Sequence, residues 1–326
     1  MRFLFSATSN PHFNLAAEEY LMRHTPYEVV FLYINRPSII VGKHQNTLAE
    51  INRKWVDEHR IPVIRRLSGG GTVYHDEGNI NFCFIRNTLS GKQVNFRVFV
   101  EPIIQYLHSL GLEASMGSKN ELRIEGKKIS GNAEHVFKNR VMHHGTLLYD
   151  SDLTALEKAI QPPLATIDDK AVKSNRSEVA NISEFLSDKL ETDRFAQHLF
   201  QFLQNFFPQH DTYHWSSADL EEINRLMDEK YRQDYWNFHY SPDYTFVNDW
   251  VLDAFFHCQV DLSVSKGIIK KAFIGGSQHQ DVLQSIAEAL TGVEHQPEAI
   301  RNVLNHHDFK GFFSLVSIDR FIELFF

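Results

Sequence analysis

The sequence predicts an α+β protein with mixed or antiparallel sheets flanked by helices, followed by a small α+β C-terminal domain. Short β-branched and aromatic runs alternate irregularly with amphipathic segments, which disfavours a doubly wound parallel sheet. The length of 326 residues exceeds what one hydrophobic core usually serves. The sequence texture changes after YWNFHYSPDYTF, so we expect one domain over 1–244 and a second over 245–326.

Periodicity and end signals locate the elements of the first half. Asn10 and Pro11 open an amphipathic segment, as a polar cap and an N-terminal proline do. Three consecutive glycines separate two apolar runs within 61–85, which predicts a strand, a turn and a strand. We expect helices at 11–22, 48–60 and 95–111, strands at 28–35 and 38–43, and short strands with glycine turns over 120–150.

The second half begins with a polar stretch and becomes helical. Residues 170–186 predict a loop that leads into an element, and 191–207 a strong amphipathic helix. Ser216 with Asp219 three residues later indicates a capping box at the start of another helix. Beyond the expected boundary we predict strands within 251–274, then helices at 281–291, at 297–306 and near 314–325.

Composition excludes several classes of protein. Lys and Arg number 33 against 41 Asp and Glu, and the net charge of −8 without a basic tail disfavours nucleic-acid binding. Two distant cysteines, Cys83 and Cys258, exclude a disulfide framework and a cysteine-rich zinc site. We see neither a secretory signal nor an apolar stretch fit to span a membrane, so we expect a cytoplasmic protein.

The most informative motif is RRLSGGGTVYHDEGN, residues 65–79. Three glycines strip side chains from a turn, so backbone N–H groups can approach a phosphate or carboxylate closely, and Arg66 could supply a bidentate cation. A plain glycine hairpin with surface arginines would give the same pattern. A Walker A loop is excluded because GxxxxGK[ST] is absent.

Two further motifs follow. In GKKISGNA, Lys127 and Lys128 face opposite sides of a strand, so only one can point at a ligand site, although a solvated lysine pair is an equal alternative. In HHGTLL, adjacent His143 and His144 also face opposite sides, which argues against a metal pair. Ser68 lacks the G-x-S-x-G elbow of a serine nucleophile.

In this order and spacing the three motifs resemble the lipoate–protein ligases, within the biotin and lipoate ligase superfamily. The resemblance runs from about residue 10 to SPDYTF, and the remainder is similar to that family's small accessory domain. It implies ligation of lipoate or octanoate to a lysine through lipoyl-AMP, with ATP and Mg²⁺ as cofactors. The implied acceptors are lipoyl domains of 2-oxo-acid dehydrogenase acyltransferase subunits or the glycine-cleavage H protein. A monomer is expected, with no nucleic-acid or membrane partner.

The resemblance also assigns residues to the site. Lys128 matches the catalytic lysine that contacts the acyl carboxyl oxygen and the phosphate. Glu121 stands where the family usually has Asp, so the metal ligands stay unknown. Residues 173–182 resemble the loop that orders over the adenylate. The residues implied in binding lipoate or nucleotide are Arg66, Ser68, Gly69, Gly70, Gly71, Thr72, Val73, Tyr74, His75, Asn120, Lys128, Ser130, Gly131, Ala133, His144 and Gly145.

Three competitors stay open. Octanoyl- and lipoyl-transferases of the superfamily use a cysteine thioester, but Cys83 lies in an apolar strand and Cys258 in the expected second domain. Biotin ligases carry a GRGRxG-type loop in place of RRLSGGG. A non-catalytic lipoyl-domain-binding relative is the third. We also expect a positive rim that steers an acidic acceptor, formed by Arg123, Lys127, Lys138 and Arg140.

Overall fold

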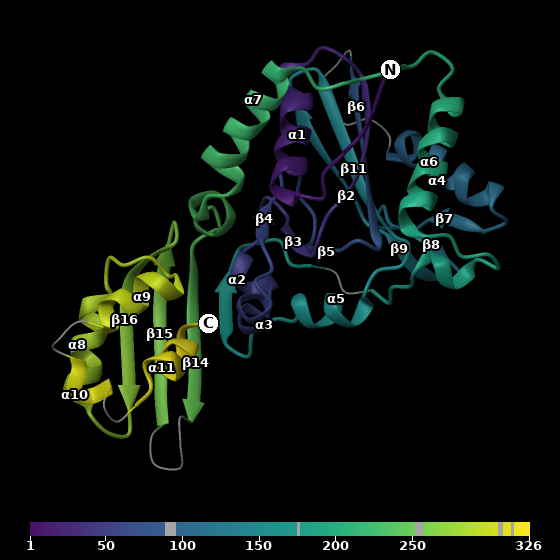
Figure 1. The fold of residues 1–326 in the computed structure, drawn as a ribbon. Helices are drawn as coiled ribbons and strands as arrows, with labels where there is room; N and C mark the ends of the chain where they lie inside the picture. Colours follow the sequence, from purple (N-terminus) through teal and green to yellow (C-terminus); the bar gives the residue numbers. More distant parts are fainter. Residues whose placement is uncertain (89–95, 175–176, 252–256, 306–308, 314–315) are drawn as a thin grey trace. The chain divides into compact units, whose positions relative to one another are not determined.

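A computed structural model describes residues 1–88, 96–174, 177–251, 257–305, 309–313 and 316–326 (Figure 1). The chain folds into two compact units, each assembled from separated stretches. The first unit comprises Met1–Lys43, Ile61–Lys158 and Ser174–Gln233, and the second His44–Arg60, Ala159–Lys173 and Asp234–Phe326. Two stretches that lie far from the C-terminus in the sequence, His44–Arg60 and Ala159–Lys173, therefore belong with the C-terminal residues. A single boundary in the sequence cannot separate these two units. The domain boundary near residue 245 stays a prediction.

A six-stranded mixed sheet forms the centre of the first unit. Its order is β10 (Asn132–Phe137), β11 (Arg140–Leu148), β6 (Asn79–Asn87), β2 (Val29–Ile34), β1 (Arg2–Phe5) and β13 (Asp211–Thr212). Strand β1 runs parallel to β2 and β13, and the other neighbours are antiparallel. The predicted α+β class with mixed sheets is confirmed.

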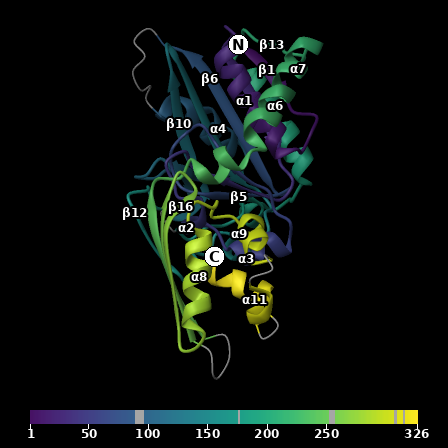
Figure 2. The same ribbon diagram turned by 90° about the vertical axis from the view of Figure 1, so that its left-hand side faces the viewer.

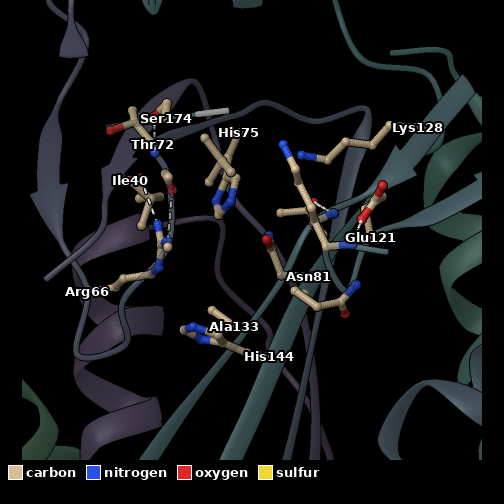
Figure 3. A pocket seen from close by; sticks show the side chains of 18 of the residues that line it. Ile40, Arg66, Thr72, His75, Asn81, Glu121, Lys128, Ala133, His144 and Ser174 are labelled. Carbon is tan, nitrogen blue, oxygen red and sulfur yellow. Dashed lines mark hydrogen bonds between the residues drawn. The ribbon is translucent and has the colours of Figure 1, made fainter. Parts of the chain in front are cut away.

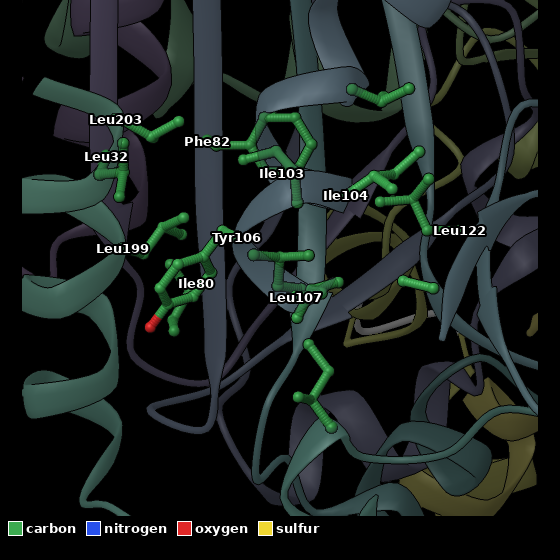
Figure 4. Close-up of a cluster of buried hydrophobic side chains, with 14 of the residues drawn as sticks. Leu32, Ile80, Phe82, Ile103, Ile104, Tyr106, Leu107, Leu122, Leu199 and Leu203 are labelled. Carbon is green, nitrogen blue, oxygen red and sulfur yellow. The ribbon is translucent and has the colours of Figure 1, made fainter. Parts of the chain in front are cut away.

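Helices cover both faces of this sheet. On one side lie α4 (Phe96–Ser109) and α6 (Thr192–Phe206), and on the other lies α1 (Pro11–His24), with α7 (Ser217–Leu226) next to it (Figure 1). Alternate residues of a strand face opposite sides, so Val30 and Leu32 join the core under α4 and α6. Figure 4 shows this core, in which Leu32, Ile80 and Phe82 of the sheet meet Ile103 of α4 and Leu199 of α6.

Two small sheets of the first unit carry the motifs. Strands β4 (Val63–Arg65), β3 (Ser38–Val41) and β5 (Val73–His75) form one, and the glycine turn joins β4 to β5. Strands β7 (Ala114–Met116), β8 (Leu122–Ile124) and β9 (Lys127–Ser130) form the other. A short helical turn, η1 (Ile182–Phe185), follows the stretch predicted as a loop.

The second unit contains a four-stranded antiparallel sheet. Its order is β12 (Thr166–Asp169), β14 (Tyr244–Val251), β15 (His257–Ser265) and β16 (Ile268–Gly276). The sheet shares one core with α8 (Gln280–Leu290), α9 (Pro297–Leu304) and α11 (Ile318–Ile322) (Figure 2). The second unit also contains helix α10 (Lys310–Phe313), a short π-helix (Tyr235–His239) and a terminal 3-10 turn (Glu323–Phe325), and a second short π-helix (Met227–Tyr231) belongs to the first unit. Some residues of the expected elements lie outside the described residues: residue 95 of the helix expected at 95–111, residues 252–256 of the strands expected within 251–274, and residues 306 and 314–315 of the later helices.

Local capping signals explain where several helices begin. The side chain of Asn10 accepts the N–H of His12 at the start of α1, and the predicted capping box of Ser216 and Asp219 is confirmed. The prediction of a single helix over 48–60 is wrong, because two helices form there, α2 (Thr47–Glu50) and α3 (Arg53–Glu58). Asn52 is extended and caps α3 by accepting the N–H of Trp55, so the chain must break there.

Some elements were not expected from the sequence. Strands β1 and β12 and helix α5 (Leu153–Ala159) are short, and β1 and β12 are held by pairing with distant strands. Among the described helices, none combines the length and apolar character that crossing a membrane requires.

Candidate active site

A cavity of about 200 Å³ opens in the first unit at the glycine turn. Arg66 and Lys128 lie on opposite sides of it, with His75 and Asn81 between them (Figure 3). The predicted site residues that line it are Arg66, Gly70, Gly71, Thr72, Val73, His75, Lys128, Gly131, Ala133, His144 and Gly145. The glycine turn at 69–71 and Lys128 therefore converge on one cavity, although they lie far apart in the sequence.

The remaining predicted residues do not line the cavity but support it. Ser68 and Gly69 are bonded to Arg66, and Tyr74 is buried. The carbonyl of Asn120 and the hydroxyl of Ser130 both accept hydrogen bonds from the amide of Asn132.

The guanidinium of Arg66 is committed to the glycine turn. Its Nε donates to Ser68 Oγ at 3.0 Å, Nη1 to the Ile40 carbonyl at 3.1 Å, and Nη2 to the carbonyls of Gly69 and Gly71 at 2.7 and 2.8 Å. Four of its five N–H donors are thus used within the protein. Burial lowers the pKa of Arg66 to about 10, which leaves it charged at neutral pH. The side chain of Arg66 therefore stabilises the glycine turn. From the sequence we expected it to bind a ligand through two parallel hydrogen bonds.

The neighbours of His75, which lines the cavity, fix the position of its ring proton. Asn14 Nδ2 donates to Asn35 Oδ1 at 2.8 Å, which orients the Asn35 amide so that its Nδ2 lies 3.0 Å from His75 Nδ1. Nδ1 therefore accepts, and the ring proton resides on Nε2, which has no partner among the described residues. Burial lowers the pKa of His75 to about 3, helped by the charge of Arg66, so the ring is neutral.

Behind the turn a buried chain of polar groups crosses to α1. Ser68 Oγ lies 2.5 Å from His144 Nε2, and His144 Nδ1 lies 2.8 Å from Glu18 Oε2. Tyr33 donates to the other Glu18 oxygen at 3.0 Å. The order resembles a serine–histidine–carboxylate relay. Ser68, however, is only 1% exposed and already accepts from Arg66, so it is not placed to attack a substrate.

Lys128 carries the ammonium on the far side of the cavity. Burial lowers its pKa, an effect that the nearby Glu121 carboxylate opposes. Its backbone N–H donates to the carbonyl of Glu178, and its own carbonyl accepts the N–H of Ala180. Strand β9 is therefore hydrogen-bonded to the second half of the 173–182 motif. Lys127 faces elsewhere, with its Nζ 3.9 Å from Glu178. The expectation that only one of the two lysines reaches the site is confirmed.

Several cavity residues were not among the predicted binding residues, although Glu121 and the 173–182 segment had been singled out by the resemblance. They come from strands and loops that are far apart in the chain: Leu15, Tyr33, Ile40, Asn81, Lys119, Glu121, Asn132, Thr146, Ser174 and Ser177. An asparagine inside the apolar run NINFCF was the available signal for Asn81. Ser174 accepts the N–H of Thr72 at 2.9 Å, which brings the 173–182 motif against the glycine turn. Asn175 and Arg176 of that motif lie outside the described residues.

Two other sequence predictions concern residues of β11, Arg140 and the pair His143 and His144. The guanidinium of Arg140 donates to the carbonyls at the end of α1, among them Leu21 at 2.8 Å and Met22 at 2.9 Å, so it caps that helix and does not belong to a positive rim. His143 and His144 do face opposite sides of β11, as predicted, since His143 stacks on Phe99 of α4 and His144 reaches Glu18 of α1.

The carboxylate of Glu121 is engaged on both oxygens. Oε2 accepts the N–H of Lys119 at 2.8 Å, and Oε1 accepts from Arg123 Nε at 2.9 Å. Burial opposes ionisation of Glu121, but these hydrogen bonds outweigh it and lower its pKa. Glu121 is the one carboxylate among the described residues that line the cavity. In the described part of the chain, no group of three His, Cys, Asp or Glu side chains could hold a metal ion.

Comparison with known proteins identifies the class. The lipoyl protein ligase A/B catalytic domain matches residues 10–204, and the bacterial lipoate protein ligase C-terminus matches residues 241–325. Lipoate-protein ligase LplJ of Bacillus subtilis is 40% identical over 325 residues, 97% of each chain. Lipoate–protein ligase 1 of Staphylococcus aureus is 40% identical over 322 residues, again 97% of each chain. The chain therefore belongs to the lipoate–protein ligase family.

Solved structures of similar proteins support this family assignment. A T. acidophilum protein with bound lipoic acid (25% identical) and a lipoate-protein ligase A bound with ATP (26% identical) each give a TM-score of 0.61, covering 73% of this chain and 98% of theirs. A bi-partite lipoate protein ligase of Thermoplasma acidophilum, studied with its E2 lipoyl domain, gives 0.60 at 26% identity over 73% of this chain and 95% of its own. The predicted family and the ATP-dependent ligation of lipoate to proteins are confirmed.

Proposed function

We propose that the cavity catalyses ligation in two steps through lipoyl-AMP. A carboxylate oxygen of lipoate attacks the α-phosphorus of ATP, and the bond to pyrophosphate breaks. The uncharged amine of an acceptor lysine then attacks the acyl carbon, the bond to AMP breaks, and the amine releases a proton to solvent. The observation that carries this proposal is that the Lys128 ammonium and the Gly70–Thr72 turn border one cavity.

The chemistry needs charge neutralisation more than a nucleophile. Lipoate carboxylate and the α-phosphate are both anionic, so their approach is opposed unless a cation lies between them. Lys128 supplies that cation as a point charge, and backbone N–H groups of the glycine turn supply neutral donors. The backbone of Lys128 and of the glycine turn is held by hydrogen bonds within the protein, which reduces the cost of reorganisation.

Magnesium enters this proposal only with the nucleotide. The one carboxylate on the cavity wall among the described residues already accepts two hydrogen bonds, so the protein offers no dedicated cage. Mg²⁺ commonly binds substrate phosphates and keeps several waters, and it would neutralise phosphate charge. We assign no protein ligand to it and no reaction step depends on it.

The finer features of substrate and partner are also proposals. Lipoate or octanoate is the acyl group, and lipoyl domains of 2-oxo-acid dehydrogenase acyltransferase subunits or the glycine-cleavage H protein are the acceptors. The T. acidophilum ligase studied with its E2 lipoyl domain supports the first kind of acceptor. We propose a monomer in the cytoplasm, where two buried free thiols, Cys83 and Cys258, would persist.

The test separates two adjacent lysines. Lys128→Ala should lower the rate of pyrophosphate release from ATP and lipoate, with acceptor omitted, on the order of 10²–10³-fold, the usual cost of removing one transition-state donor. Lys127→Ala is the matched control and should release pyrophosphate at the wild-type rate. Both variants should unfold at wild-type temperature. Wild-type turnover by Lys128→Ala would refute the assignment.

A further inference from the structure

One buried titratable pair has no part in the mechanism above. His143 of β11 lies directly opposite Glu134 of β10 in the strand register. The His143 side chain is 0% exposed and the Glu134 side chain 3% exposed. The imidazole is stacked 5.0 Å from the Phe99 ring at 8° and meets the edge of Phe96 at 5.0 Å, so apolar rings from α4 seal it from water.

The proton on His143 can be placed from its neighbours. Asn132 Nδ2 donates to the Asn120 carbonyl at 2.9 Å, and a carbonyl only accepts, so the orientation of the Asn132 amide is fixed. Its Oδ1 therefore faces His143 Nε2, 3.2 Å away. Nε2 must carry the proton that Oδ1 accepts. In a neutral ring Nδ1 is then an acceptor that requires a donor.

Glu134 is the group that can donate. Its Oε1 lies 3.3 Å from His143 Nδ1, and its Oε2 is buried without a partner among the described residues. An ionised carboxylate would leave that oxygen desolvated and unpaired, whereas a neutral acid donates its O–H to Nδ1 and leaves only a weak acceptor. Burial raises the pKa of Glu134 to about 7 and lowers that of His143 to about 3, which favours the same neutral pair.

The pair acts on the cavity through Asn132. The amide of Asn132 lines the cavity and is bonded to Asn120, which lies in a turn with a left-handed φ of 64°. Lys119 and Glu121 reach the cavity from the same turn. Opposite Asn132 in the register is Gly145, where an added Cβ would lie 2.4 Å from Asn132 Oδ1. The missing side chain at Gly145 is therefore what lets the amide reach the histidine.

We propose that Glu134 and His143 are positioning residues of the ligase. Glu134, as a neutral acid, fixes the His143 tautomer, His143 holds the Asn132 amide, and Asn132 anchors the turn that brings Lys119 and Glu121 to the cavity. The catalytic consequence rests on the proposed function of the cavity, but the proton arrangement does not.

Substitutions at Glu134 test the donor role. In Glu134→Gln an amide N–H replaces the acid O–H, so pyrophosphate release should keep kcat and the KM for ATP within about twofold of wild type. Glu134→Leu offers no donor, and we expect the KM for ATP to rise about tenfold with a smaller change in kcat. The matched control is Glu113→Gln, an exposed glutamate. Equal impairment of Glu134→Gln and Glu134→Leu, or no effect of either, would overturn the proposal.

A spectroscopic readout is independent of activity. Long-range ¹H–¹⁵N spectra of histidine-labelled protein at pH 6 should show the signal of a neutral Nε2–H imidazole for His143. This signal should be absent from His143→Gln and present in Glu134→Gln. A doubly protonated His143 would mean an ion pair and would refute the neutral arrangement. If the cavity had another function, the wild-type protein itself would release no pyrophosphate from ATP and lipoate, while this tautomer signal would stay.

Discussion

Gly145→Ala probes the tightest contact behind the cavity. In β11 Gly145 is opposite Phe82 on one side and Asn132 on the other. An added Cβ would lie 2.4 Å from Asn132 Oδ1 and 2.5 Å from Phe82 Cζ, distances that real Cβ atoms do not tolerate. The Phe82 ring cannot move freely, since it is fully buried and in contact with Phe84 at 5.9 Å between centroids.

The expected cost follows from overpacking a filled core. Inserting a methyl group into such a core costs about 1–3 kcal/mol, and in a domain of roughly 150–250 residues each kcal/mol lowers Tm by about 2–4 °C. Calorimetry should therefore find Gly145→Ala melting several degrees below wild type. Asn132 would be displaced as well, so the KM for ATP in pyrophosphate release should rise.

A second glycine of the same cavity provides the control. At Gly131 the atom nearest to an added Cβ would be the Nζ of Lys128, 3.5 Å away, which is ordinary van der Waals contact. Gly131→Ala should therefore melt close to wild type. If the two variants unfold at the same temperature, the packing argument for Gly145 is wrong.

Four further expectations can be checked with the same assays. Arg66→Lys cannot reach four acceptors at once, so we expect the KM for ATP to rise and Tm to fall; unchanged values would show that the turn does not depend on the guanidinium. Cys83→Ala and Cys258→Ala should retain ligation, because burial raises the pKa of both thiols; loss of activity in a folded variant would favour a thioester transferase. His295 donates to the Phe325 carbonyl, and burial lowers the pKa of His295 from 6.5 to about 4. As the pH drops, the unfolded state therefore binds the proton before the folded state does, and the free energy of unfolding falls between pH 6.5 and pH 4. Melting curves at pH 5 and 7 should show a smaller fall for His295→Gln than for wild type. Acylation of the acceptor should slow as ionic strength rises if a positive rim steers it, and insensitivity to salt would exclude steering.

Sequence patterns predicted features that depend on near neighbours. Asn10 with Pro11 gave the start of α1, and Ser216 with Asp219 gave the capping box, because such hydrogen bonds join residues two or three apart. The opposite directions of His143 and His144 followed from strand alternation alone. The break at Asn52 was missed although asparagine is a common cap, because the apolar spacing of Trp55 and Val56 favoured one continuous helix.

Features that depend on distant pairing were out of reach. Tyr33 and Asn81 enter the cavity because β2 pairs with β6, and nothing within either strand fixes that register. Arg66 could be chosen from its position beside the glycines, but its role depends on carbonyls that only the folded turn presents. The motifs therefore predicted where the site lies more reliably than they predicted which groups remain available to a ligand.

The two backbone hydrogen bonds between Lys128 and the 178–180 segment limit how the enzyme can be re-engineered. Because the N–H of Lys128 donates to Glu178 and its carbonyl accepts from Ala180, an insertion or deletion within 178–180 would remove the register that holds the lysine. Libraries that aim at new acyl groups should therefore vary side chains in this segment while keeping its length. Changes of length there would displace Lys128, the cation that we propose for catalysis, and a loss of turnover could not be ascribed to specificity.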